Sequence, residues 1–325
     1  MKRISVYIIF ALLLIVACSP IAEAAIVETE IEAPQNVEIA EEQVAADQSI
    51  SIIDGLGREI HLNAPATSIV ALGPSSLESL FAIGAGDQIV GREEYSSYPE
   101  EALEIPSIGN LFTELPIEAI LALEPDLVIA PQIVSPENVQ RLIDLGLTVF
   151  WQANPSDFNG LFENIIDLAQ LTGHEEEAEA LIVSLASRVR AVKDVTSYAE
   201  HTPLVFYELD ATDPENPYTI GAGVFIDTII SLAGGKNIGA VLNGDYAQMS
   251  SEEVILQNPE VILLADALYG VSPEIVSARS GWEGIDAVVN GQVLPFDPFL
   301  VSVPGPRMVE GLESMALLLH PDLFE

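Results

Sequence analysis

A repeated segment is the feature of this sequence that most limits how the chain can fold. The segment that begins at Leu115 reads LPIEAILALEPDLVIA, and the segment that begins at Met249 reads MSSEEVILQNPEVILL. At a constant offset of 134 residues, Glu118 matches Glu252 and Pro125 matches Pro259. Each copy has the pattern of a short helix, a turn of proline and an acid, and a buried strand. The chain is therefore expected to contain two related halves.

Strand and helix signals alternate within each half. Two apolar runs around Asp54-Gly55 predict a β-hairpin at 49–62, and Ser75 and Ser76 are placed to cap the first helix. Short apolar runs typical of buried strands lie at 68–72, 88–91, 127–130, 148–151, 204–209 and 261–264. Strands that alternate with helices in this way indicate parallel sheets covered by helices.

A helical region separates the two halves. Asp157 can cap a helix that Gly173 ends, and 174–198 has apolar residues at helical spacing over about 35 Å. We therefore expect an α/β fold of two Rossmann-like lobes, whose central sheets are joined by a single long rigid α-helix. The predicted parts are an N-terminal lobe at 49–155, a bridging helical segment at 156–200 and a C-terminal lobe at 201–325. A cleft between two such lobes is a favoured place for a ligand.

The N-terminus has the pattern of a secretory signal. Lys2 and Arg3 precede an apolar run at 4–17, which is shorter than the roughly 20 residues of a membrane-spanning helix. The run ends in I-V-A-C, which resembles a bacterial lipoprotein box in which the cysteine is acylated. The prediction is a signal at 1–18 and an acylated Cys18 that anchors the chain to a membrane outside the cytoplasm. The alternative is an ordinary signal cut near Ala25, with Cys18 discarded.

Acidity excludes several kinds of partner. The chain carries 50 Asp and Glu against 11 Lys and Arg, a formal net charge of −39. Residues 19–48 contain acids but no Lys or Arg, which predicts an acidic flexible linker between the membrane and the folded body. The charge excludes a general affinity for nucleic acid and disfavours long-range capture of strongly anionic ligands.

No arrangement typical of an enzyme occurs in the sequence. The motifs G-x-S-x-G, G-x-x-x-x-G-K-[ST] and H-E-x-x-H are absent, and there is no cysteine pair for a metal. The four histidines lie in different predicted regions, at positions 61, 174, 201 and 320. The sequence therefore predicts no catalytic residues, no cofactor and no metal site.

The order of several segments resembles one family. These are IVALGPSSLESLFAIGAGDQIVG, EYSSYP and IEAILALEPDLVIA in the first half, and TIGAGVFIDTIISLAGGKNIG, SSEEVILQNPEVIL and GPRMVEGLE in the second. They span residues 50–321 and are similar to the bacterial substrate-binding proteins that deliver vitamin B12, iron–siderophore complexes or haem to ABC importers. The resemblance implies two lobes bridged by one helix, small closure on binding, and an ABC permease as partner.

The resemblance also assigns roles to two glutamates. In that family each lobe presents a surface glutamate that pairs with arginines of the permease, and Glu118 and Glu252 match these positions. They are the same two residues that the internal repeat aligns. An exposed carboxylate offers an arginine a bidentate contact, and two of them fix the docking orientation. The alternative is that each glutamate only favours the start of its own helix through the helix dipole.

In the vitamin B12 receptor of this family, aromatic side chains of both lobes sandwich the ligand. Tyr95 falls in the matching EYSSYP segment, and Phe112 stands where that receptor has a tryptophan. Large flat ligands suit aromatic surfaces. We expect a ligand site made of Tyr95, Phe112, Trp151, Tyr218, Tyr246, Phe299 and Arg307. For Trp151 and Phe112 the alternative is an ordinary core position, and Tyr98 can equally be a packing residue.

The ligand class stays open among a corrinoid, an iron chelate and haem. Anionic catecholate complexes usually need several arginines, and only Arg92, Arg279 and Arg307 are expected near the cleft. We therefore expect a corrinoid or a neutral hydroxamate chelate ahead of a catecholate, with haem as an alternative through a tyrosine ligand.

The predicted function is a monomeric, lipid-anchored receptor outside the cytoplasm that delivers a small metal-chelate ligand to an ABC permease. One alternative is an anchored sensor or scaffold of the same fold without a transporter. Another is a secreted hydrolase, for which the sequence offers no nucleophile.

Overall fold

The computed structural model describes residues 48–112 and 114–324. The predicted signal, Cys18 and the linker up to residue 47 lie outside the described residues, so the expectations about them stay predictions. The described residues belong to one compact unit.

The N lobe is built on a four-stranded parallel sheet with the strand order β4-β3-β5-β6. Its strands are β3 (Ile69–Ala71), β4 (Ile89–Arg92), β5 (Leu127–Pro131) and β6 (Val149–Gln152). A separate antiparallel hairpin joins β1 (Ile50–Ile53) to β2 (Glu59–Leu62), which confirms the predicted hairpin. The helical elements of this lobe are α1 (Pro74–Ala82), α2 (Ile117–Ala122), α3 (Pro136–Asp144) and the 3₁₀ turns η1 (Gly86–Gln88) and η2 (Glu100–Glu104).

The C lobe repeats this sheet with the order β12-β11-β7-β9, again fully parallel. Its strands are β7 (Leu204–Glu208), β9 (Lys236–Asn237), β11 (Val261–Leu264) and β12 (Val293–Pro295). A two-stranded antiparallel ribbon of β8 (Tyr218–Ile220) and β10 (Tyr246–Gln248) is added to it. The helices are α6 (Phe225–Leu232), α7 (Ser251–Gln257), α8 (Pro273–Ser277), α9 (Asp286–Val289), α10 (Phe299–Ser302) and α11 (Met308–Leu319). The 3₁₀ turns are η3 (Ile238–Val241), η4 (Ala267–Tyr269), η5 (Trp282–Gly284) and η6 (Pro321–Leu323).

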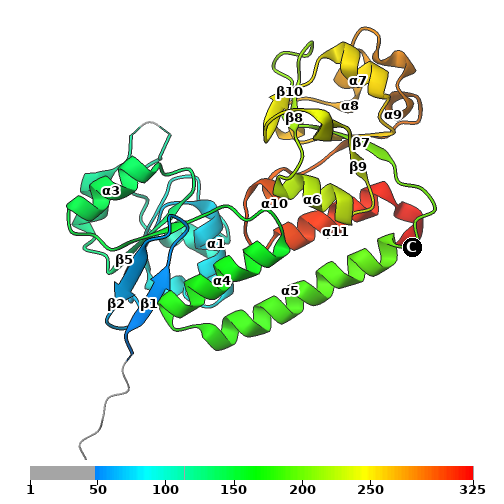
Figure 1. The fold of residues 1–325 in the computed structure, drawn as a ribbon. Helices are drawn as coiled ribbons and strands as arrows, with labels where there is room; N and C mark the ends of the chain where they lie inside the picture. Colours follow the sequence, from blue (N-terminus) through cyan, green and yellow to red (C-terminus); the bar gives the residue numbers. More distant parts are fainter. Residues whose placement is uncertain (1–47, 113, 325) are drawn as a thin grey trace, which may run out of the picture. The chain divides into compact units, whose positions relative to one another are not determined.

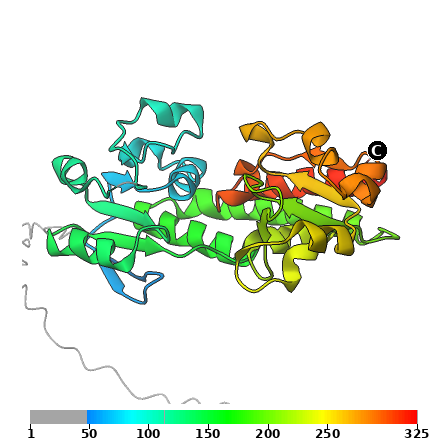
Figure 2. The same cartoon turned by 90° about the horizontal axis from the view of Figure 1, so that it is seen from above.

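Two helices occupy the segment between the lobes. α4 (Phe158–Thr172) packs on α1 of the N lobe, and α5 (Glu175–Thr196) packs on both α4 and α11 (Figures 1 and 2). Asp157 caps α4 by accepting a hydrogen bond from the backbone N–H of Gly160 at 2.9 Å, as predicted. α5 extends over about 33 Å at 1.5 Å per residue, long enough to contact helices of both lobes.

The core explains how the lobes are joined. One cluster of buried apolar residues continues from Leu80 of α1 through Leu185 of α5 to Leu312 of α11. Each lobe also has its own cluster on the other side of its sheet, around Trp151 in the N lobe and Trp282 in the C lobe. Because the first cluster crosses from lobe to lobe, the helices between the lobes are packed on both. The predicted α/β fold of two lobes with central parallel sheets is confirmed.

The predicted cap of the first helix was wrong. Gly73 occupies the cap position of α1, Pro74 follows it, and no side chain caps the helix. Ser76 is buried, and its hydroxyl has no hydrogen-bond partner in the described part of the chain. Proline at the first helical position needs no partner for its missing N–H. Pro74 therefore starts the helix two residues earlier than a cap at Ser75 would.

Candidate ligand-binding site

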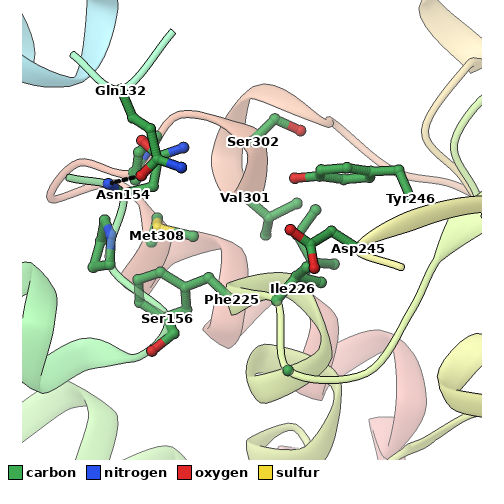
Figure 3. A pocket seen from close by; sticks show the side chains of 14 residues that line it. Gln132, Asn154, Ser156, Phe225, Ile226, Asp245, Tyr246, Val301, Ser302 and Met308 are labelled. Carbon is green, nitrogen blue, oxygen red and sulfur yellow. Dashed lines mark hydrogen bonds between the residues drawn. The ribbon is translucent and has the colours of Figure 1, made fainter. Parts of the chain in front are cut away.

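A cavity of about 250 Å³ lies between the two lobes (Figure 3). Its N-lobe wall comes from the segments that follow β5 and β6, at the edge where the carboxyl ends of parallel strands meet. Its C-lobe wall comes from the start of α6, from the ribbon and from α10 with the chain that leads to α11. The lining residues are Gln132, Asn154, Pro155, Ser156, Gly223, Val224, Phe225, Ile226, Asp245, Tyr246, Val301, Ser302, Pro304 and Met308.

The N-lobe wall is held by its own amides. The Gln132 side-chain oxygen accepts a hydrogen bond from the backbone N–H of Asn154 at 2.8 Å, which ties the two strand ends together (Figure 3). Across the cleft, the Thr228 hydroxyl of α6 donates to the Ser156 carbonyl at 3.1 Å. The two walls are therefore linked by a direct hydrogen bond at the base of the cavity.

The C-lobe wall depends on a close backbone crossing. An added Cβ at Gly221 would lie 2.0 Å from the Gly244 carbonyl oxygen, so only glycine fits where β8 meets the turn before β10. Asp227 of α6 then accepts hydrogen bonds from the Gly223 N–H and from the Asn237 amide, both at 3.0 Å. These contacts fix the ribbon and the start of α6, which together present Asp245 and Tyr246 to the cavity (Figure 3).

Two of the predicted aromatic residues form a pair on the N lobe. The Tyr95 and Phe112 ring centroids are 5.7 Å apart, and the rings are tilted by 60°. Both rings are exposed, Phe112 at 72%. They meet because the segments that carry them run beside each other, joined by the hydrogen bond from the Glu94 N–H to the Gly109 carbonyl. Tyr95 follows β4, at the same sheet edge as Gln132 and Asn154. The structure thus presents an uncovered aromatic surface beyond the carboxyl end of β4.

Three further predicted aromatics lie on the C lobe. Tyr218 and Tyr246 belong to the paired strands β8 and β10, and the register places both side chains on the same face of the ribbon. Tyr246 lines the cavity, whereas Tyr218 is exposed on the ribbon beside it. Phe299, also exposed, is the first residue of α10, the helix that provides Ser302 to the cavity.

The other two predicted ligand residues have internal partners. Trp151 is 8% exposed, its indole N–H donates to the Val134 carbonyl at 2.9 Å, and its ring packs on Gly55 of the hairpin. Arg307 donates to the Glu78 carboxylate of α1 through Nε at 2.8 Å and through its backbone N–H at 2.9 Å. Its guanidinium also stacks over the Tyr98 ring at 3.9 Å. Neither Trp151 nor Arg307 lines the cavity of about 250 Å³.

Buried acids lie at the carboxyl ends of the C-lobe strands. Glu208 ends β7 and forms a buried ion pair with Arg279, with N–O distances of 2.5 and 2.8 Å. Asp266 follows β11, and burial together with the neighbouring Glu208 charge raises its pKa to about 6. One Asp266 oxygen accepts from the Ala211 N–H at 3.0 Å, and the other has no partner among the described residues.

The two glutamates of the repeat take equivalent places. Glu118 lies in the first turn of α2 and Glu252 in the first turn of α7, and both are exposed. Each helix is followed by a residue with left-handed backbone, a proline, and the central strand β5 or β11. The geometry therefore presents one free carboxylate at the same position of each lobe.

The described residues contain neither a cluster of metal ligands nor a membrane-spanning helix. Within 48–112 and 114–324, no group of three or more His, Cys, Asp or Glu residues is placed to hold a metal ion. No helix in this part of the chain is long and apolar enough to cross a membrane.

Sequence reasoning missed five polar residues that line the cavity, which are Gln132, Asn154, Ser156, Asp245 and Ser302. Two of them could have been found, because Gln132 and Asn154 come directly after predicted buried strands of a parallel sheet, where ligands usually bind. Asp245 and Ser302 had no such signal, since the ribbon and the short α10 have no clear periodicity.

Comparison with known proteins places this architecture in a family. The family model described as periplasmic binding protein matches residues 69–298. The ABC transporter substrate-binding lipoprotein YvrC of Bacillus subtilis, itself described as uncharacterized, is 30% identical over 85% of this chain and 87% of its own length. A cobalamin-binding protein of Halobacterium salinarum is 30% identical over 82% of this chain and 73% of its own length. The crystal structure of the periplasmic vitamin B12-binding protein BtuF of Vibrio cholerae has a TM-score of 0.68 and 28% identity, covering 79% of this chain and 98% of that one.

Solved haem-binding proteins share the fold as well. The periplasmic haem-binding protein RhuT from Roseiflexus has a TM-score of 0.71 at 24% identity, covering 79% of this chain and 99% of its own. At that identity the likeness concerns the fold alone. The family that the sequence motifs indicated is confirmed, and this chain belongs to the periplasmic binding proteins.

Proposed function

We propose that this chain is a receptor outside the cytoplasm that captures a corrinoid or a neutral iron chelate and delivers it to an ABC permease. The observation that carries the proposal is the cavity between the lobes, with exposed aromatic side chains on both sides of the cleft. In this role the chain binds and releases its ligand without catalysis and without a cofactor of its own.

The aromatic surfaces favour a large flat ligand. A cavity of about 250 Å³ is below the roughly 300–1,000 Å³ of common small-molecule pockets, so a macrocycle would extend beyond it onto the rim. Exposed rings that such a ligand would contact are Tyr95 and Phe112 of the N lobe and Tyr218, Tyr246 and Phe299 of the C lobe. Relatives named for cobalamin or vitamin B12 binding support a corrinoid as the first choice.

Delivery would use the two exposed glutamates. Glu118 and Glu252 lie at equivalent positions of the two lobes, so together they can pair with two arginines of the permease and fix its docking orientation. An acylated Cys18 would keep the receptor near the permease, in line with the lipoprotein name of the Bacillus subtilis relative. The proposed receptor acts as a monomer.

The ligand assignment is tested by a thermal-shift and native mass spectrometry screen of the purified chain. The ligands are cyanocobalamin, cobinamide, a ferric hydroxamate, a ferric catecholate and haem. We expect stabilisation by a corrinoid or the hydroxamate, lost in Tyr95→Ala and Tyr246→Ala because each removes a ring from one side of the cleft. Trp151→Phe separates its two readings, since a core residue would lower stability but leave the ligand dissociation constant unchanged. No stabilisation by any of the five would sink the assignment.

Docking is tested separately from binding. The double variant Glu118→Ala/Glu252→Ala should bind ligand with unchanged affinity and abolish uptake in cells that carry the cognate permease. A loss of ligand affinity in that variant would contradict this division of roles. Glu283→Gln, which removes another exposed carboxylate of the C lobe, is the matched control and should support normal uptake.

A further inference from the structure

The arginines expected near the cleft are all occupied by internal partners. Arg279 is 9% exposed in its side chain and forms the ion pair with Glu208, while Arg307 forms the one with Glu78. Arg92 is buried and donates to the Glu93 and Glu94 carbonyls at 3.2 and 3.0 Å. A guanidinium that already holds a carboxylate or carbonyls inside the protein has little left to offer an anionic ligand.

The cavity itself has a single charged side chain among its lining residues. That residue is Asp245, and no Lys or Arg belongs to the lining in the described part of the chain. Its side chain is exposed and forms no hydrogen bond or ion pair with another described residue. Figure 3 shows the Asp245 carboxylate directed into the cavity beside the Tyr246 ring.

Other carboxylates reinforce this charge from within the C lobe. Burial and then the Asp245 charge raise the pKa of Tyr246. Burial is also the main cause of the raised pKa of Tyr207 on β7, to which the charges of Asp297 and Asp266 contribute. At the cavity itself the Asp245 carboxylate lies beside Tyr246 without a neighbouring cation in the lining, and desolvation by a bound ligand would strengthen its field.

We infer that the cleft selects its ligand by charge, with Asp245 as the residue that favours a cationic chelate over a neutral one and a neutral one over an anionic one. This rests on the proposed function and adds the charge of the ligand to it, with cationic corrinoids and chelates bound most tightly. Asp245 and Tyr246 together suit a ligand with a positive metal centre, because a carboxylate pairs with the charge while the ring face attracts a cation. A ligand with free carboxylates or catecholates would meet Asp245 without a compensating arginine.

The test compares ligands that differ in charge, and the two cobalamins of the first series differ in little else because only one axial ligand changes. Calorimetric titrations of the full chain at slightly acidic pH would use aquocobalamin, which is cationic, against cyanocobalamin, which is neutral. A second series would use ferrioxamine B, ferrichrome and ferric enterobactin, which are cationic, neutral and anionic. In whichever series binds, we expect the cationic member to bind about fivefold to twentyfold more tightly than the neutral one, as expected for one partly screened charge pair. Added salt should reduce that ratio.

Variants assign the ratio to a residue. Asp245→Asn keeps the shape of the side chain and should bring the ratio of cationic to neutral affinity close to one, whereas Glu283→Gln should leave it as in the wild type. Asp245→Lys should invert the order and admit the anionic ligand. An unchanged ratio in Asp245→Asn, or an anionic ligand that binds the wild type as tightly as a cationic one, overturns the inference and leaves the proposed function standing. A chain that binds no member of either series overturns both.

Discussion

The N lobe and the C lobe share their sheet down to single hydrogen bonds. The order β4-β3-β5-β6 of the N lobe corresponds to β9-β7-β11-β12 of the C lobe. In both lobes a residue with positive φ, Glu124 or Asn258, precedes the proline that leads into the central strand. The residue after that proline is Asp126 or Glu260. It accepts a hydrogen bond from a backbone N–H at the start of the neighbouring strand, that of Ser68 or Leu204.

The lobes differ in what surrounds this shared sheet. The C lobe inserts the β8–β10 ribbon, which carries Tyr218, Asp245 and Tyr246, and the N lobe instead has the loops that pair Tyr95 with Phe112. The exposed glutamates lie on repeated elements, whereas Asp245 and Tyr246 of the cavity lie on or next to the ribbon, which the N lobe does not have. The repeat therefore specifies the sheets and the proposed docking points, while the proposed ligand contacts lie mainly on parts found in one lobe only.

A buried ion pair gives the largest expected difference between the lobes. Sheet register makes Leu72 of the N lobe the counterpart of Glu208, which pairs with Arg279. Glu208→Ala leaves a buried guanidinium without its carboxylate and should lower the free energy of unfolding by about 3–5 kcal/mol. Urea denaturation measures this change.

A matched double variant converts this site to the chemistry of the N lobe. Glu208→Leu/Arg279→Met removes both charges together, so it should recover most of the stability that the single variant loses. The half-exposed pair of Arg188 and Glu313 is the control, and Glu313→Ala should cost no more than about 1 kcal/mol. A Glu208→Ala variant as stable as the wild type would show that the ion pair does not stabilise the C lobe.

Asp266 offers a second difference, visible as a pH dependence. Its N-lobe counterpart in the repeat is Gln132, which is neutral, whereas burial and Glu208 raise the pKa of Asp266 to about 6. An acid whose pKa is higher in the folded chain than in the unfolded chain favours folding when protonated. Its stabilising contribution is therefore lost as pH rises from about 4 to about 6.

Asp266→Asn should remove this part of the pH dependence and stabilise the chain at neutral pH by about 1–3 kcal/mol. Burial also raises the pKa of Asp167, to about 6, and those of Glu78 and Glu93, so the readout is the difference between wild type and variant across the pH series. Asp167→Asn is a control outside the C-lobe sheet. Parallel stability curves for wild type and Asp266→Asn would contradict the assignment.

More of the fold than of the candidate ligand site could be predicted from the sequence. The repeat and the apolar runs were enough for both parallel sheets, because buried strands need continuous apolar residues. Tyr246 was found among aromatic candidates, but burial of Trp151 and the ion pair of Arg307 with Glu78 depend on contacts between residues 97 and 229 positions apart. No local pattern reports such pairs. Asp245 was hidden for the same reason, since its place in the cavity follows from the ribbon and not from its neighbours in the chain.

The smallest expected effect concerns the acids that the lobes share. Asp126 accepts hydrogen bonds from the Thr67 N–H and hydroxyl and from the Ser68 N–H at 2.8–3.0 Å, and these bonds lower its pKa. Glu260 accepts from the Leu204 N–H at 2.9 Å. If the two acids stabilise their lobes equally, Asp126→Ala and Glu260→Ala should each lower the free energy of unfolding by about 0.5–1.5 kcal/mol at neutral pH.

The loss of stability in Asp126→Ala should also depend on pH. Because the pKa of Asp126 is lower in the folded chain, its contribution is present above the unfolded pKa of about 4 and is lost as pH falls through the folded value. The penalty of Asp126→Ala should therefore shrink in acid. Equal penalties for the two variants at neutral pH would mean that each lobe holds its first strand by the same contact. A much larger penalty for Asp126→Ala would mean that its three hydrogen bonds outweigh those of Glu260 to the Leu204 N–H and to the His201 ring, at 2.9 and 2.7 Å. The lobes would then share this contact in geometry but not in strength.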